Sequence, residues 1–412
     1  MTAQMPAPPS PREIEIEVLD GGLEVVPGLK TSGIAAGIKP DGKLDLGVIV
    51  ADAPCNIAGV FTQNQAAAAP ILLCKELLAK QRICRAVVVN SGNANALTGA
   101  QGDEDARAVA EAAEAHFGGP VLPLSTGVIG VPLPRERIIS GLAGCKAQLG
   151  ADTTSFAQAI LTTDTCTKQA ARRVRLADGD WAYVGGVAKG SGMIHPNMAT
   201  MLAFLATDAP VSSAALDGVL RRITATTFNQ ISVDGDTSTN DAVLALAPTD
   251  PQGELHDGSP QVRDLEEAFR QVAADLAEQI VADGEGATKV LQLRVHGARW
   301  PGDARAIARA IIASPLVKTA LHGGDANWGR IIAAAGNAGV EFDLDALELR
   351  LGGHLVFTDG HPQLDEQELA ERCFKDDRVR AELKVGDGGA EVTVLTSDLS
   401  ADYVSINANY RT

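Results

Sequence analysis

The chain has 412 residues, a length that at about 150 residues per domain predicts two or three domains, or two lobes that share one core. Hydrophobic residues make up 45% of it, which is enough to form a large core and excludes a mainly disordered chain. The formal net charge of −17 would repel phosphate groups, so neither a nucleic acid nor an anionic membrane is an expected partner.

The N-terminal segment and the cysteines both favour a cytoplasmic protein. The segment MTAQMPAPPSPREIEIEV lacks the basic flank and apolar run of a secretory signal, and its Pro-rich part, residues 1–12, is expected to be a disordered leader. No stretch approaches the roughly 18 uninterrupted apolar residues of a membrane span. The cysteines form no C-x-x-C pair, so we expect buried small hydrophobic residues, not disulfides or zinc ligands. They are Cys55, Cys74, Cys84, Cys145, Cys166 and Cys373.

Apolar spacing along the chain predicts a mixture of helices and strands. The run at 87–90 is typical of a buried strand. Three-to-four spacing predicts helices over 104–117, 134–149, 213–227 and 262–282. Further strands are expected over 181–188, 202–207, 243–246, 290–295, an alternating stretch at 340–356, 390–396 and 403–407. Because these elements do not alternate regularly and no nucleotide-type glycine loop occurs, the pattern favours a layered α+β fold over a doubly wound sheet.

The segment that begins at Asp234 raises the question of a metal. Asp234, Asp236 and Ser238 occupy alternate positions, as the ligands of a calcium loop would. Such a loop would also have Gly at its sixth position and Glu at its twelfth, where this chain has Thr239 and Ala245. A turn closed by Asx-type hydrogen bonds is therefore the favoured interpretation, and no metal is expected.

The segment DGEGATK, residues 283–289, resembles a phosphate-binding loop only superficially. It lacks the glycine–lysine spacing of such a loop, and the carboxylate of Glu285 would repel a phosphate. A glutamate on a loop made flexible by glycines is better suited to a cationic group of a ligand.

His195, Thr200 and Asp208 lie close together in the segment KGSGMIHPNMATMLAFLATDA, residues 189–209, and suggest a local catalytic triad. The members of such triads normally converge from separate elements of the fold. A structural role for His195 is therefore the favoured interpretation.

Ala199 and Thr200 in the same segment open a run of strand-forming residues. A threonine in this place is most often only a β-branched strand residue. The alternative is an N-terminal nucleophile, in which the chain cuts itself before the threonine and the freed α-amino group activates the hydroxyl. An α-amine titrates near about 7.7–8.0, so it can accept a proton close to neutral pH without a histidine.

Ten motifs, spread over nearly the whole chain after its first 20 residues, occur in an order shared with one known family. They are GIAAGIKPDGKLDLGVIV, GVFTQNQAAAAP, VVVNSGNANALTG, LSTGVIG, LTTDT, the segment 189–209, FNQISVDGDTSTND, DGEGATK, GGDANWGRI and INANYRT. On these motifs the chain resembles the ornithine acetyltransferase family, also called arginine biosynthesis bifunctional protein or glutamate N-acetyltransferase. Two departures, Leu97 where many relatives have Cys and the pair Cys166 and Thr167 after TTDT, affect no residue expected to be catalytic.

This resemblance implies roles for individual residues. The bond between Ala199 and Thr200 would be the site of self-cleavage, and Thr200 would be the nucleophile. Thr126 and Gly127, within LSTGVIG, would form the oxyanion hole. The residues that would contact the substrate are Thr163, Lys189, Thr200, Glu285, Asn407 and Thr412.

The fold and assembly of the family are implied as well. The fold is a layered α/β/β/α sandwich of the ornithine acetyltransferase and β-peptidyl aminopeptidase type. Self-cleavage would yield an α chain, residues 13–199 after the leader, and a β chain, residues 200–412, which stay intertwined in one catalytic unit. Two copies of each would form an α2β2 heterotetramer.

The chemistry of the residues agrees with these roles. Lys189 has no fixed anionic neighbour in the sequence and suits a substrate carboxylate, whereas Glu285 suits an ammonium group. Thr126 and Gly127 stand where a strand meets a turn, a place that exposes donors to a developing oxyanion. Without the resemblance, Lys189 would more typically be a surface lysine and Asn407 a turn residue.

The resemblance implies that Thr200 takes acetyl from N2-acetyl-L-ornithine and passes it to L-glutamate through an acetyl-threonine ester. This is a ping-pong acyl transfer of arginine biosynthesis, and it implies neither a metal nor an organic cofactor. The sequence leaves open whether acetyl-CoA serves as a further donor.

Two other functions remain open at this point. An N-terminal-nucleophile aminopeptidase of the β-peptidase type would have a similar fold and hydrolyse its substrate, although such enzymes generally use Ser and lack DGEGATK together with INANYRT. A non-catalytic amino-acid-binding protein would have lost self-cleavage.

Overall fold

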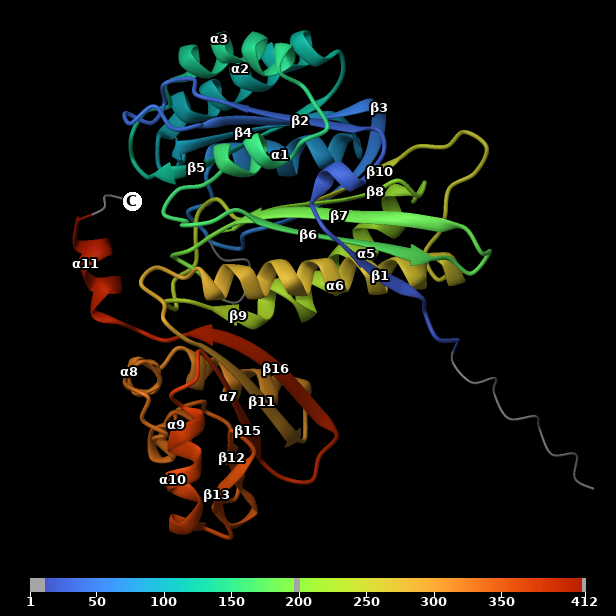
Figure 1. Ribbon diagram of the computed structural model, residues 1–412. Coiled ribbons are helices and arrows are strands. Elements are labelled where there is room, and N and C mark those ends of the chain that lie inside the picture. The colour runs from blue at the N-terminus through green and yellow to red at the C-terminus, as the bar shows by residue number, and fades with distance from the viewer. Residues whose placement is uncertain (1–11, 196–200, 410–412) are drawn as a thin grey trace, which may run out of the picture.

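The computed structural model describes residues 12–195 and 201–409 (Figure 1). Ala199, Thr200 and Thr412 lie outside these residues, as does nearly all of the leader expected over 1–12. Within them, no helix is both long enough and apolar enough to cross a membrane.

A sheet of nine strands is the centre of the larger part of the molecule. Its order is β1-β6-β7-β8-β10-β3-β4-β5, and β2 also pairs with β3. The pairs β4–β5 and β8–β10 are parallel, and the other pairs are antiparallel. The strands are β1 (Ile16–Leu19), β2 (Leu29–Ile34), β3 (Leu46–Phe61), β4 (Ile83–Asn93), β5 (Val121–Val128), β6 (Lys168–Arg175), β7 (Trp181–Lys189), β8 (Leu202–Thr207) and β10 (Ala242–Pro248).

The long strand β3 belongs to two layers of this sheet. Up to Val50 it pairs with β2 and β4, and from Cys55 onward it pairs mainly with β10, after a register shift between these two residues. The two halves of the sheet therefore face each other. Val87 of β4 and Phe204 of β8 are buried in one apolar cluster between them.

Helices cover the outer face of each half, as Figure 1 shows. α2 (Gly99–Phe117) and α3 (Arg135–Ala147) cover the half that contains β4, where Val88 is buried against them. α5 (Ser213–Thr226) and α6 (Pro260–Ala282) cover the other half. Alternate residues of this strand face the inner cluster and the helices, so both of its faces are buried. The run that contains Val87 and Val88 is therefore apolar throughout. The expected α/β/β/α sandwich is confirmed.

The helix α6 illustrates how local sequence sets an element of this fold. Ser259 caps it by accepting a hydrogen bond from the backbone N–H of Val262 at 3.2 Å, and Pro260 occupies the first turn. The apolar residues spaced three to four apart are buried against β6 and β7. They are Leu265, Phe269, Val272, Leu276 and Ile280. The shorter helices α1 (Ala69–Lys80) and α4 (Thr154–Ala159) bury side chains in the cluster between the sheet halves.

A second sheet, with a core of its own, forms the smaller part of the molecule. Its strand order is β14-β13-β12-β15-β11-β16-β9. The strands are β9 (Ile231–Ser232), β11 (Val290–Ala298), β12 (Glu348–Leu351), β13 (His354–Thr358), β14 (His361–Pro362), β15 (Arg378–Lys384) and β16 (Ala390–Ser397). Its helices are α7 (Pro301–Ile312), α8 (Pro315–Gly323), α9 (Trp328–Gly336) and α10 (Leu364–Cys373). Over the whole of the described chain, three 3₁₀ turns cover Leu23–Val25, Phe228–Gln230 and Leu344–Ala346.

Two strand predictions near the C-terminus are wrong. Residues 403–407 belong to the helix α11 (Ala401–Asn409), not to a strand, and Ser400 accepts a hydrogen bond from the N–H of Tyr403 as a capping residue does. The alternating stretch 340–356 is broken into β12 and β13 by Gly352 and Gly353, both of which have positive φ. Apolar alternation over so few residues does not distinguish a strand from a short helix, or one long strand from two short strands joined by a turn.

The prediction of buried cysteines holds for four of the six. Cys55, Cys74, Cys84 and Cys145 are buried as free thiols. Cys166 is exposed and Cys373 is half-buried, and neither forms a disulfide.

Candidate active site

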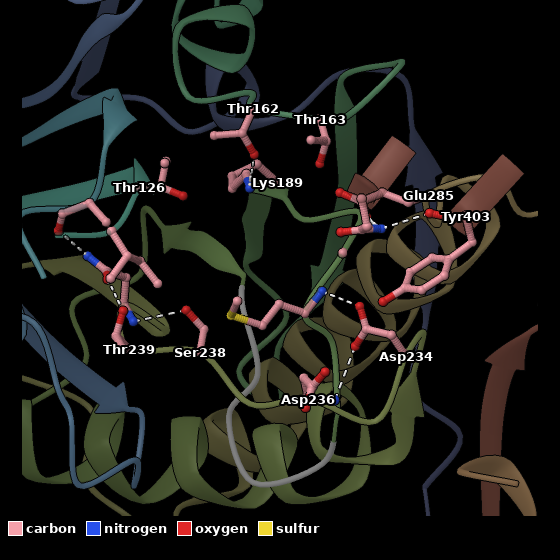
Figure 2. A pocket seen from close by; sticks show the side chains of 17 residues that line it. Thr126, Thr162, Thr163, Lys189, Asp234, Asp236, Ser238, Thr239, Glu285 and Tyr403 are labelled. Atoms are coloured by element: carbon pink, nitrogen blue, oxygen red, sulfur yellow. Dashed lines mark hydrogen bonds between the residues drawn. The ribbon is translucent and has the colours of Figure 1, made fainter. Parts of the chain in front are cut away.

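A cavity of about 220 Å³ lies where loops from both sheet halves meet α11 (Figure 2). Six of the residues predicted from the family motifs line it. They are Thr126, Gly127, Thr163, Lys189, Glu285 and Asn407. Figure 2 shows Thr126 on one side of the cavity, Glu285 and Tyr403 on the other, and Lys189 with Thr162 between them. The three remaining predicted residues, Ala199, Thr200 and Thr412, lie outside the described part of the chain.

Thr126 and Gly127 stand at the carboxyl end of β5, where the pairing with β4 becomes irregular. Asn93 opposes both Thr126 and Val128 across the two strands. Gly127 has a φ of +130°, and a Cβ on it would lie 2.5 Å from the carbonyl carbon of Gly92, so only glycine fits here. The irregular register at the end of a strand leaves this backbone beside the cavity, as the sequence predicted.

Lys189, the last residue of β7, is not the surface lysine that its sequence context suggested. Its side chain is 2% exposed, and Nζ donates a hydrogen bond of 2.6 Å to Oγ1 of Thr162. Nζ also lies 3.6 Å from Oδ2 of Asp164. Lys189 has no anionic neighbour beside it in the sequence, but the fold supplies one, Asp164 of the TTDT motif.

Glu285 lies at the opposite side of the cavity and is 8% exposed. Its Oε2 accepts a hydrogen bond of 2.7 Å from Nδ2 of Asn407, which ties α11 to the DGEGATK loop. Gly286, the next residue, has a φ of +67°. A Cβ on Gly192 would lie 2.4 Å from the carboxyl carbon of Glu285, so the glycine lets the KGSG loop approach the carboxylate closely.

Asp234 closes the turn that the sequence analysis favoured over a calcium loop. Its Oδ1 accepts hydrogen bonds from the N–H of Asp236 at 3.1 Å and of Ile194 at 3.0 Å. Burial raises the pKa of Asp234 to about 6. Tyr403 is adjacent, and burial, with the charges of Asp234 and Glu285, raises its pKa above the usual range. Across residues 12–195 and 201–409, no group of three or more His, Cys, Asp or Glu side chains is placed to hold a metal ion.

His195 and Asp208 do not converge, so the local triad is not formed. Nδ1 of His195 lies 3.2 Å from Oγ of Ser232. Asp208 stands beyond the far end of β8, where its Oδ1 accepts a hydrogen bond of 2.7 Å from the N–H of Tyr183. The structural interpretation of His195 is therefore confirmed.

Asp241 is a residue of this region that sequence reasoning missed, although it ends the motif FNQISVDGDTSTND. Its side chain is fully buried, and Oδ1 accepts a hydrogen bond of 3.0 Å from the N–H of Met201, the residue after Thr200. Its Oδ2 has no hydrogen-bond partner among the described residues. Burial raises the pKa of Asp241 well above its usual range, so the folded protein keeps this proton to a higher pH than the unfolded chain does.

We expect the substitution Asp241→Asn to change how stability depends on pH. A raised pKa in the folded state means that the wild type loses stability as pH rises from 3.8, the ordinary value, through the raised pKa. The neutral amide removes this loss, so the melting temperature of the variant should improve relative to the wild type as pH rises. Thermal melts of both proteins from acidic to neutral pH measure the difference. Parallel curves would mean that Asp241 is ionised in the folded chain.

The comparisons with known proteins match nearly the whole chain. The model of the ArgJ family matches residues 30–412. The arginine biosynthesis bifunctional protein ArgJ of Gloeobacter violaceus is 45% identical over 407 residues, which are 97% of this chain and 100% of the relative. The chain belongs to the ArgJ family. The ArgJ protein of Geobacter sulfurreducens is 47% identical over 397 residues, 94% of this chain and 100% of that one.

Two solved structures are similar to the chain at 37% sequence identity. The ArgJ protein from Bacillus halodurans has a TM-score of 0.42, with 46% of this chain and 100% of that chain covered. An ornithine acetyltransferase complexed with ornithine from Mycobacterium tuberculosis has a TM-score of 0.41, with 44% and 98% covered. Membership of the ArgJ family confirms the expected family and enzyme class, an acyltransferase of arginine biosynthesis.

Proposed function

We propose that the chain cuts itself between Ala199 and Thr200 and then carries acetyl from N2-acetyl-L-ornithine to L-glutamate on the hydroxyl of Thr200. The observation that supports this most strongly is one cavity lined by Thr126 and Gly127, by the ammonium of Lys189 and by the carboxylate of Glu285. The next described residue after the proposed nucleophile, Met201, is held by Asp241. The name of the relative solved with ornithine agrees with such a substrate.

In the first step of the proposal, Oγ1 of Thr200 attacks the carbonyl carbon of Ala199, and the peptide bond is replaced by an ester. This exchange breaks the bond from the Ala199 carbonyl to the nitrogen of Thr200 and so frees its α-amino group, after which water opens the ester to give the carboxylate of Ala199 and the free hydroxyl of Thr200. This amine accepts the hydroxyl proton in each later turnover, because its ordinary pKa lies near about 7.7–8.0.

In the second step, the freed threonine attacks the acetyl carbonyl of the donor. The hydroxyl of Thr126 and the backbone N–H of Gly127 donate hydrogen bonds to the oxyanion, ornithine leaves with the proton, and an acetyl-threonine ester remains. The α-amine of glutamate then attacks the carbonyl of this ester, the bond from the acetyl carbon to Oγ1 of Thr200 breaks, and the amine proton passes by way of the α-amino group of Thr200 to Oγ1. N-acetylglutamate leaves and the hydroxyl is restored. The proposal needs no metal and no organic cofactor.

The charged groups of the cavity suit both substrates in this proposal. The α-carboxylate is common to donor and acceptor, and Lys189 binds it. The free ammonium of the donor is on its side chain, since the α-nitrogen carries the acetyl group, and Glu285 binds that ammonium. Thr163, Asn407 and Thr412 complete the substrate contacts.

Two measurements test the proposal. Denaturing electrophoresis should separate fragments of residues 1–199 and 200–412, and N-terminal sequencing of the second should read Thr-Met-Leu-Ala-Phe. Acetylornithine incubated with glutamate should give acetylglutamate, whereas hydrolysis unaffected by glutamate would favour the aminopeptidase. A single uncleaved band would favour the non-catalytic binding protein. The same assay with acetyl-CoA in place of acetylornithine decides whether the chain accepts a second donor.

The proposed assembly, an α2β2 heterotetramer in the cytoplasm, has its own test. The two fragments should co-elute under native conditions, with a mass twice that of the 42.7 kDa chain by light scattering. Elution at the mass of one chain would contradict it.

The substitution Glu285→Gln should weaken the donor reaction more than the acceptor reaction. Loss of a hydrogen bond to a charged group costs about 1.5–3 kcal/mol, so kcat/KM for acetylornithine should fall about tenfold or more. Ornithine release and acetylglutamate formation, assayed as separate half-reactions, measure the two effects. Glu76→Gln, at an exposed ion pair on α1, is the matched control. Equal losses in both half-reactions would argue against an ammonium site at Glu285.

A further inference from the structure

We propose that Lys168, which does not line the cavity, keeps Lys189 available for the substrate carboxylate by neutralising Asp164 and Asp283. The inference rests on the proposed function, in which Lys189 binds that carboxylate. Lys168 is thus a positioning residue, because it acts on the substrate only through Lys189.

The four charged groups form one buried network behind the cavity. Nζ of Lys168 lies 2.8 Å from Oδ1 of Asp164 and 2.5 Å from Oδ2 of Asp283, and its side chain is fully buried. The side chain of Asp164 is also fully buried, and that of Asp283 is 7% exposed. Oδ2 of Asp164 lies 3.6 Å from Nζ of Lys189. Asp164 therefore stands between the two lysines.

The same carboxylates hold the loops that carry the predicted substrate residues. Asp164 accepts hydrogen bonds from the N–H of Thr162 at 2.9 Å and of Gly190 at 2.6 Å. Asp283 accepts one from the N–H of Thr165 at 3.0 Å. The network thus joins the TTDT loop, the KGSG loop and the DGEGATK loop, on which Thr163, Lys189 and Glu285 lie.

The ion pair between Asp164 and Lys168 favours the charged form of both side chains. Burial opposes the charge of Asp164, but the charges of Lys189 and Lys168 hold its pKa below the usual range. Burial likewise opposes the charge of Lys168, and Asp164 raises its pKa in spite of that. Two ammonium groups then balance two carboxylates in a site of low dielectric, where an uncompensated charge is costly.

The balance explains what Lys168 does for Lys189. With Lys168 present, its ammonium group contacts both Asp164 and Asp283 and neutralises much of their negative charge. Without it, Lys189 would be the only lysine left in a network with two carboxylates, and an incoming substrate carboxylate would meet a net negative group. Two further groups interact with Lys189: Lys39, which Asp45 also attracts, and Asp241, whose pKa burial raises well above its usual range.

The substitution Lys168→Met tests this on the self-cleaved full-length protein, since it removes the charge and keeps the apolar length of the side chain. KM should rise about tenfold or more for both acetylornithine and glutamate, because both present a carboxylate to Lys189. The fall in kcat should be smaller. The double variant Lys168→Met with Asp283→Asn restores the balance of charge and should recover most of the loss in KM. Lys80→Met, which removes an exposed ion pair on α1, is the control and should leave both KM values unchanged.

The recovery distinguishes an electrostatic role of Lys168 from a merely structural one. If the role were structural, a second substitution in the network would make the loss in KM worse. Unchanged KM values in Lys168→Met, or no recovery in the double variant, would overturn the inference. If Lys168→Met does not fold, the KM values of the single variant Asp283→Asn test the inference. This variant leaves two lysines with one carboxylate and should lower both KM values, so a rise in both would overturn the inference.

The wild type distinguishes this inference from the proposed function. If it does not transfer acetyl from acetylornithine to glutamate, the proposed function fails. Calorimetric binding of L-ornithine to the same variants then takes the place of the KM values. Weaker binding in Lys168→Met that the double variant recovers would support the role of Lys168, and equal binding in all variants would overturn it.

Discussion

The substitution Thr200→Ala should leave the chain in one piece and without acetyl-transfer activity. Both proposed steps use the hydroxyl of Thr200, first against the carbonyl of Ala199 and then against the acetyl group of the donor. No other side chain takes over both roles in the proposal, so the loss should be complete in each. Denaturing electrophoresis of the purified variant measures cleavage, and release of ornithine from acetylornithine measures the transfer.

The matched variant is Thr200→Ser, which keeps the hydroxyl and should retain part of both activities. Its melting temperature and that of Thr200→Ala should stay close to that of an uncleaved wild-type sample, which excludes unfolding as the cause. An uncleaved chain with full transferase activity would refute the nucleophile mechanism.

The substitution Thr126→Ala should lower kcat by about 10²–10³, equivalent to about 2.7–4 kcal/mol of transition-state stabilisation. The reason is that an oxyanion donor acts on charge that is absent from the ground state, so KM for acetylornithine should change little. The side chain of Thr126 is 3% exposed and lines the cavity, so its loss also leaves a small void. Steady-state kinetics with both substrates measure the separation of kcat from KM.

Thr126→Ser is the control for this prediction, because it keeps the hydroxyl and loses only a methyl group. Gly127→Ala is not a clean test, since its Cβ would collide with the backbone of Gly92. Self-cleavage should be slower in Thr126→Ala as well, because it passes through an oxyanion at the carbonyl of Ala199. A rise in KM with unchanged kcat would instead assign Thr126 to ground-state binding.

Periodic apolar spacing was a reliable guide to long elements of this fold. The helix predicted over 262–282 agrees with α6 (Pro260–Ala282), and the one over 213–227 agrees with α5 (Ser213–Thr226). Such patterns record which face of an element is buried, and long elements repeat the pattern several times. The short helix α11 buries none of its residues, so it has no such pattern and was predicted as a strand.

The sequence by itself determined the family, the layered α+β class and the candidate residues of the site, because ten ordered motifs and repeated apolar spacing are local signals that need no folded structure to be seen. Only the tertiary structure decided what surrounds those residues. Nothing in the sequence pairs Lys168 with Asp283, 115 positions away, or brings Asp241 to the N–H of Met201. Burial and partner set the charge that a side chain carries, and both arise only when distant segments pack together.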